Sequence, residues 1–220
     1  MDAEIKGYIF DFDGTLADSL PGIHASWAIT FTRLGLTPPT YDAVRRAIGP
    51  TRDEYLRMLL GDNAPRFQEE ALKIFKEVYK KDTIFQTVLY DGIKELISEL
   101  NKRGMKLAIA SNKPHKQLLT LTDYLFGKDS PFDPVLGPET VAKGKPEPDM
   151  FLACAEAWKI APSNVVVVGD TPLDMEAGKR AGMRRIAVRW GYGDNDALDR
   201  CFPDFNALKA SDVSIWNAPR

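Results

Sequence analysis

Short apolar runs, each too short to form a helix, constrain the fold more than any other feature of the sequence. They are rich in β-branched and aromatic residues and lie at Tyr8–Phe10, Leu107–Ile109, Val165–Val168 and Ile186–Val188. Helical patterns separate several of them, as in the apolar positions Ile93, Leu96, Ile97 and Leu100, which Gly104 closes. Strands that alternate with helices predict an α/β fold with a doubly wound, Rossmann-like parallel sheet.

One stretch, from about Ser19 to Thr83, breaks this alternation, because it has helical periodicity and no credible strand. Its apparent helices run from Pro21 to Leu34, Tyr41 to Ile48, Arg52 to Leu60 and Pro65 to Lys81. Glycine or proline residues separate these segments. We therefore predict an inserted α-helical bundle at residues 19–83, between core segments at residues 1–18 and 84–220.

Composition excludes several classes of protein. The 220 residues are 44% hydrophobic and 27% charged, as in an ordinary globular protein, and 29 basic against 31 acidic residues give a net charge of −2. That balance offers no basic field for a nucleic acid. The start lacks the pattern of a signal peptide, and no apolar stretch approaches the ~18 residues of a membrane helix. We expect a cytoplasmic protein with no membrane partner.

Acidic residues follow two of the predicted strands at the point where each strand ends. Asp11 and Asp13 lie in a Phe-Asp-Phe-Asp-Gly-Thr string, and Asp170 and Asp174 follow Val165–Val168. The carboxyl ends of parallel strands line one crevice, so these carboxylates are expected to converge. Oxygen ligands without His or Cys favour Mg²⁺ over zinc. Asp174 has an alternative role, because Thr171 and Asp174 also have the spacing of a helix cap.

Two further strings complete a candidate phosphate site. Ser111 and Asn112 follow the strand at Leu107–Ile109, where a hydroxyl and backbone N–H groups at a helix start suit an anion. A plain serine cap is the alternative. Lys145 precedes Pro146, whose fixed φ restrains the chain around that lysine. Because the other strings already predict a phosphate site, Lys145 is expected to neutralise the charge of the phosphate group.

These four strings, in this order, resemble the haloacid dehalogenase superfamily of phosphohydrolases over nearly the whole chain. The resemblance implies that the helical insertion is a cap domain, that Asp11 is the nucleophile, and that Mg²⁺ is held by Asp11, Asp170 and the backbone carbonyl of Asp13. Tyr90-Asp91-Gly92 and Trp190-Gly191-Tyr192-Gly193 look like the phosphoglycolate phosphatase branch.

In this reading the enzyme hydrolyses a small phosphorylated metabolite through an aspartyl-phosphate. Asp13 is placed as general acid and then base, because it lies two residues from Asp11 on the same side of an extended strand. Ser111, Asn112 and Lys145 bind the phosphate, and Asp174 orients water or holds Lys145.

Two other functions share parts of this pattern. A sugar-phosphate mutase of the same fold would return the phosphate to sugar, but such mutases have Glu-Asp where this chain has Gly169-Asp170, and His24 falls one position from their cap histidine. A signalling receiver module also carries a phosphorylated aspartate, but it lacks a helical insertion.

The residue that reads the leaving group is expected in the helical insertion. Arg45, Arg46 and Arg52 flank the Gly49-Pro50 break, where a loop can face the crevice. Arg45 and Arg46 lie beside an apolar stripe and are expected to be solvated. Arg52 follows the break directly, so we expect it to bind a small anionic leaving group such as a carboxylate.

Overall fold

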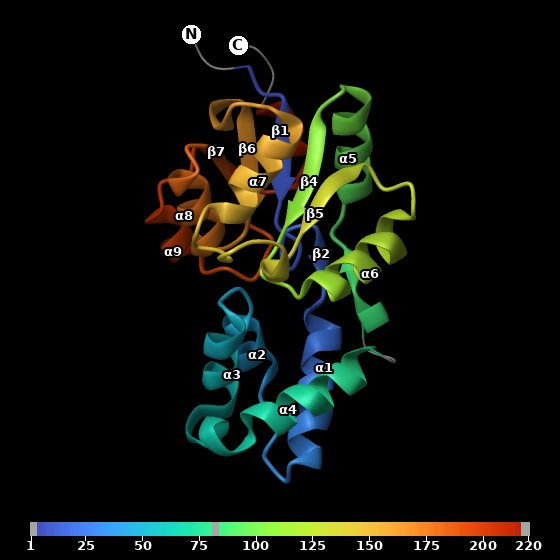
Figure 1. The fold of residues 1–220 in the computed structure, drawn as a ribbon, viewed down its shortest axis with the longest axis vertical. Coiled ribbons are helices and arrows are strands. Elements are labelled where there is room, and N and C mark those ends of the chain that lie inside the picture. The colour runs from blue at the N-terminus through green and yellow to red at the C-terminus, as the bar shows by residue number, and fades with distance from the viewer. Residues whose placement is uncertain (1–3, 81–83, 217–220) are drawn as a thin grey trace.

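The computed structural model describes residues 4–80 and 84–216 and contains a six-stranded parallel sheet (Figure 1). The strand order is β5-β4-β1-β6-β7-β8. The strands are β1 (Gly7–Phe10), β4 (Lys106–Ala110), β5 (Phe132–Leu136), β6 (Val165–Gly169), β7 (Arg184–Val188) and β8 (Phe205–Ala207). The chain runs outward from β1 in one direction and from β6 in the other. The four predicted strands and the doubly wound topology are confirmed.

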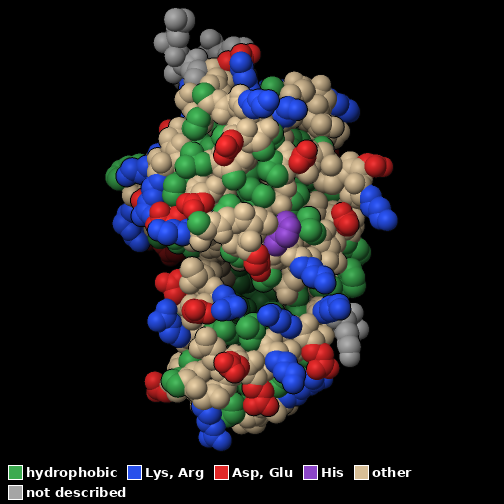
Figure 2. Space-filling view, viewed as in Figure 1, with side chains coloured by type: hydrophobic (Ala, Val, Ile, Leu, Met, Phe, Trp, Pro, Cys, Tyr) green, Lys and Arg blue, Asp and Glu red, His purple; other side chains and the backbone are tan. Residues whose placement is uncertain are grey.

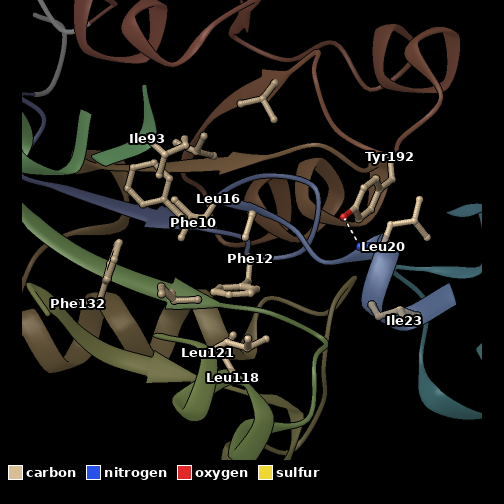
Figure 3. Packing of buried hydrophobic residues seen from close by; sticks show 14 of the residues in the cluster. Phe10, Phe12, Leu16, Leu20, Ile23, Ile93, Leu118, Leu121, Phe132 and Tyr192 are labelled. Carbon is tan, nitrogen blue, oxygen red and sulfur yellow. Dashed lines mark hydrogen bonds between the residues drawn. The ribbon is translucent and has the colours of Figure 1, made fainter. Parts of the chain in front are cut away.

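Helices cover both faces of this sheet. They are α5 (Ile93–Lys102), α6 (His115–Phe126), α7 (Asp149–Trp158), α8 (Pro172–Arg180), α9 (Asn195–Asp199) and α10 (Ala210–Ile215). Tyr8 and Phe10 of β1 pack with residues of α5, α6 and α10, whereas Ile9 packs with residues of α7 and α8. Figure 3 shows Phe10 between Ile93 and Phe132. This alternation is the two-residue period of a strand that is buried on both faces.

The helical insertion lies apart from the sheet, below it in Figure 1. It contains α1 (Leu20–Arg33), α2 (Tyr41–Ala47), α3 (Arg52–Leu60) and α4 (Ala64–Val78), and we call these four helices the helical lobe. Its centre is aromatic: the Trp27 ring stacks on Phe75 with centroids 4.5 Å apart. The predicted end of the fourth helix at Lys81 and the predicted boundary at Thr83 lie outside the described residues.

A two-stranded antiparallel ribbon joins the helical lobe to the sheet. The chain leaves through β2 (Ala17–Asp18) and returns through β3 (Val88–Leu89), and these strands pair with each other. The two segments that connect the sheet with the helical lobe therefore lie side by side in this ribbon. Within the described residues, no helix has the length and apolar character needed to cross a membrane.

Candidate active site

The turn after β1 brings the end of that strand against Asp170. Asp11 follows β1 directly, and its backbone N–H donates to the carbonyl oxygen of Val168 at 2.9 Å. Gly14 has a φ of 88°, and a Cβ at that position would lie 2.2 Å from a carboxylate oxygen of Asp170. Only glycine combines this backbone angle with so close an approach.

Three buried carboxylates converge at the carboxyl ends of β1 and β6. Asp11, Asp170 and Asp174 each offer an oxygen atom within 4.8 Å of the others. Lys145 enters from the loop before α7, and its Nζ lies 2.7 Å from Asp11 Oδ1 and 2.6 Å from Asp174 Oδ1. The structure thus brings together four of the residues that the sequence pattern selected.

Asp174 takes part in a helix cap and in this cluster at once. Its Oδ2 accepts hydrogen bonds from the backbone N–H and the hydroxyl of Thr171, at 3.0 and 2.6 Å, which caps α8. Its Oδ1 contacts Lys145. The two interpretations of Asp174 are therefore compatible, because each uses a different carboxylate oxygen.

The cluster holds more negative charge than its single ammonium group compensates. Burial raises the pKa of Asp11 to about 6, against the opposing effect of Lys145. Burial, together with the Asp11 and Asp174 carboxylates, raises the pKa of Asp170 to about 8. Burial opposes the charge on Lys145, but Asp11 and Asp174 outweigh it and raise the lysine's pKa. Three carboxylates against one ammonium form a donor set suited to a divalent cation.

Ser111 and Asn112 lie at the end of β4, as predicted, and both line the pocket at the active site. The Ser111 hydroxyl accepts from the backbone N–H of Lys113, at 3.3 Å. The Asn112 side chain holds the Lys145 backbone, accepting from its N–H at 2.9 Å and donating to its carbonyl at 3.0 Å. It also donates to the Gly49 carbonyl of the helical lobe, at 2.8 Å. The Asn112 amide therefore links three segments of the site.

Lys113 is a buried residue of this site that the sequence analysis missed. Its Nζ lies 2.9 and 3.2 Å from the two carboxylate oxygens of Asp13, and it faces the Tyr79 ring, with its Nζ 5.3 Å from the centroid. Asp13 also accepts from the Ser19 hydroxyl. Asp13 is therefore held by Lys113, from the loop that follows β4, and by Ser19, which directly precedes α1.

Tyr192 connects the Asp170 carboxylate to the start of the helical lobe. Its backbone N–H donates to Asp170 Oδ2 at 2.8 Å. Its hydroxyl accepts from the backbone N–H of Leu20 at 3.0 Å (Figure 3). It also accepts from the backbone N–H of Ser19 at 2.8 Å and donates to Asp18. Tyr192 thus connects the first turn of α1 with a candidate metal ligand.

The arginines near Gly49 have different environments. Arg45 donates to the Tyr192 carbonyl at 2.8 Å, so the expectation that it is only solvated is wrong. Arg46 pairs with Asp42 and is exposed, as expected. Arg52 lines the pocket, but its side chain is 66% exposed and pairs with the neighbouring Asp53. It lies at the mouth of the pocket.

A pocket of about 440 Å³ lies between the sheet and the helical lobe and includes Asp11, Asp13 and Lys145 in its lining. Figure 2 shows a hollow at this level with hydrophobic side chains at its floor and basic side chains around it. His24 is not among the pocket residues; its Nε2 lies 3.3 Å from the Pro39 carbonyl oxygen.

Comparison with known proteins identifies the family. The model of the haloacid dehalogenase-like hydrolases matches residues 8–188. The chain belongs to this family. It is 34% identical over 205 residues to a phosphoglycolate phosphatase of Aquifex aeolicus, and the match covers 93% of each chain. A family hydrolase from Streptococcus pneumoniae has a similar structure, with a TM-score of 0.86, 28% identity, and coverage of 96% of this chain and 98% of that one.

One relative in the family carries a different activity in its name. The tyrosine-protein kinase PtkA of Mycobacterium tuberculosis is 30% identical over 193 residues, which cover 87% of this chain but 65% of that protein. The match to the Aquifex phosphatase instead spans nearly all of both chains. The protein is accordingly a phosphatase of the haloacid dehalogenase-like family.

Proposed function

We propose that the protein is a Mg²⁺-dependent phosphomonoesterase that hydrolyses a small, phosphoglycolate-like metabolite through an aspartyl-phosphate at Asp11. The contact of one buried ammonium, Lys145, with both Asp11 and Asp174 at the sheet end of the pocket carries this proposal. The helical lobe, within residues 19–83, serves as the cap over a core formed by residues 1–18 and 84–220.

In the first step the Asp11 carboxylate attacks phosphorus, the bond from phosphorus to the ester oxygen breaks, and the leaving oxygen takes a proton from Asp13. Lys145 reduces the repulsion between the carboxylate and the phosphate oxygens. The Ser111 hydroxyl and neighbouring backbone N–H groups bind those oxygens. Asn112 and Asp174 hold Lys145 in place through the hydrogen bonds described above.

In the second step water attacks the aspartyl-phosphate at phosphorus, which releases phosphate and regenerates Asp11. Asp13, now a carboxylate, takes the proton from that water. Lys113 and Ser19 fix the position of its carboxylate group. Splitting the hydrolysis into two displacements replaces one difficult step with two easier ones.

Asp11, Asp170 and the backbone carbonyl of Asp13 would hold Mg²⁺, with Asp174 beside them. When bound, the ion supplies positive charge to neutralise the phosphate and the buried carboxylates. The donor set fits this ion, because all its ligands are oxygen atoms and Lys145 alone leaves the three carboxylates undercompensated.

Phosphate release should therefore depend on Mg²⁺. We expect chelation by EDTA to abolish phosphate release from phosphoglycolate, and added Mg²⁺ to restore it. Ca²⁺ should inhibit, because its larger and looser coordination sphere misplaces the nucleophile relative to the phosphate. Phosphate measured by a colorimetric assay after exhaustive chelation tests the proposal, and full activity at that point would exclude a role for the cation.

Arg52 should bind an anionic group of the leaving alcohol from the mouth of the pocket. Replacing it with alanine is expected to raise KM for phosphoglycolate about tenfold, the usual scale for losing one charged hydrogen bond. Cleavage of a neutral aryl phosphate should be almost unchanged. Arg46→Ala is the control, because Arg46 is exposed and pairs with Asp42. Equal losses on both esters, or no loss on either, would remove Arg52 from this role.

A further inference from the structure

The helical-lobe side of the pocket is lined largely by apolar and aromatic side chains. These are Trp27, Ile48, Tyr55, Leu72, Phe75 and Tyr79. At about 440 Å³, the pocket falls within the ~300–1,000 Å³ typical of sites for ligands much larger than a two-carbon acid. A leaving group as small as glycolate would leave the half-buried members of this lining, Ile48, Tyr55 and Leu72, in contact with water.

The aromatic part of this lining is held by ring contacts. Trp27 stacks on Phe75 with centroids 4.5 Å apart, and Phe75 stacks on Tyr79 with centroids 5.4 Å apart. The Tyr55 hydroxyl accepts a hydrogen bond from Trp27 Nε1, which fixes both rings. These contacts between buried rings hold the wall of the pocket in place, so an apolar group that enters loses little free energy to reorganisation of the protein.

Most charged lining residues fall into two zones; Glu139, which is exposed on the sheet side and accepts from the His115 backbone N–H at 2.9 Å, lies outside both. The ammonium groups of Lys113 and Lys145 lie buried at the sheet end and are paired with aspartates. On the helical-lobe side the charged lining residues, Arg52, Asp53 and Lys76, are all exposed. The space between these zones is bounded by apolar side chains, where an unpaired charge would be costly.

We propose that the natural leaving group is a hydroxy acid that carries an apolar or aromatic side chain, so that the substrate resembles phosphoglycolate with such a substituent on its carbon. The inference rests on the proposed function and names the substrate class of the same site. The phosphate lies at the carboxylate cluster, the apolar substituent packs against the half-buried side chains of Ile48, Tyr55 and Leu72, and the acid group reaches the mouth of the pocket.

Two esters that differ only by a phenyl ring test this assignment. Phospholactate and O-phospho-3-phenyllactate are both phosphates of secondary hydroxy acids, so the ester chemistry and the carboxylate are matched. We expect kcat/KM for the phenyllactate ester to exceed that for phospholactate by about tenfold or more, as for moving a phenyl ring out of water. A smaller ratio would overturn the inference.

Variants of α4 test whether the preference for the phenyl-bearing ester arises in this pocket. Leu72 is half-buried and lines the pocket, so Leu72→Asn should reduce the ratio to below about threefold by making the lining polar. Leu72→Met should keep it, because methionine preserves an apolar side chain of similar volume. Lys73→Asn is the control, because Lys73 is exposed on the same helix and is not a lining residue.

The quantity compared between variants is the ratio of kcat/KM for the phenyllactate ester to kcat/KM for phospholactate. A general loss of activity lowers both values together and leaves this ratio unchanged. A parent ratio that survives Leu72→Asn would overturn the inference, because the ring would then be recognised elsewhere. Phosphate release with an inverted ratio would overturn it and leave the proposed phosphatase mechanism standing. If neither ester released phosphate in a reaction that Asp11→Asn abolishes, the proposed function would be overturned as well.

Discussion

Replacing Asp11 with asparagine should reduce phosphate release to below ~1% of the parent rate, because the amide keeps the volume of the side chain but is not a nucleophile. Asp11 lies 6% exposed at the end of β1, where its Oδ1 contacts Lys145 at 2.7 Å. The measurement is steady-state phosphate release at saturating Mg²⁺, with phospholactate and phosphoglycolate as substrates.

The fold of this variant should be preserved. Burial raises the pKa of Asp11 to about 6, so the site stabilises its carboxylate poorly, and a neutral amide is tolerated there. Thermal unfolding followed by circular dichroism should show a melting temperature close to that of the parent. Asp123→Asn, at an exposed position of α6, controls for the general effect of the exchange. Residual turnover above ~1% in folded Asp11→Asn protein would exclude Asp11 as the nucleophile.

Loss of the Lys145 ammonium should have the second largest effect. Lys145→Ala leaves the Asp11 and Asp174 carboxylates buried without their shared partner, which costs about 3–5 kcal/mol for a broken buried pair. Turnover should fall at least ~100-fold, since the ammonium also offsets the repulsion between Asp11 and the phosphate. Urea unfolding and phosphate release measure the two losses separately.

Two companion variants separate charge from geometry. Lys145→Arg should also be severely impaired, because a planar guanidinium does not replace a compact ammonium that lies 2.6–2.7 Å from two carboxylates. Lys143→Ala should behave like the parent, because Lys143 is exposed. A nearly normal Lys145→Ala enzyme would contradict the assignment and would direct attention to Lys143.

The central strands could be predicted from sequence because each is buried on both faces. Val165–Val168 reads as an unbroken apolar run for that reason, and β6 occupies the middle of the sheet. The edge strands β5 and β8 gave no such signal. Phe132–Leu136 has only one fully buried residue and contains Pro134, which an edge strand tolerates. Their strand character depends on pairing with a neighbour, which no local pattern reports.

The candidate site was predictable where the chemistry demands a residue type directly after a strand. Asp11 and Asp170 follow β1 and β6, and the parallel topology alone brings them together. Lys113 was missed, and Tyr192 was noted only as part of a family-like string, for a different reason. Their contacts with Asp13 and Asp170 span 100 and 22 residues of sequence, and an isolated lysine or tyrosine gives no sign of such a partner. The signal available for Lys113 was its position two residues after Ser111, in the string that follows β4.

Arg45, in the helical lobe, also makes a contact with a distant residue that the sequence did not predict. Its position beside the apolar stripe of α2 predicts a solvated side chain, and 39% of the side chain is indeed exposed. Its Nη1 nevertheless reaches the Tyr192 carbonyl across the boundary with the sheet. The helical period determines which face is apolar, but the position of the helix relative to the sheet determines which polar side chains find partners there.

The stereochemical course at phosphorus tests the account's central claim most directly. A phosphorothioate ester made chiral at phosphorus with two oxygen isotopes is hydrolysed in water labelled with the third oxygen isotope, and the configuration of the released inorganic thiophosphate is determined. Transfer to Asp11 followed by transfer to water inverts phosphorus twice, so the account predicts net retention. Net inversion would mean a single direct attack by water and would contradict the aspartyl-phosphate mechanism.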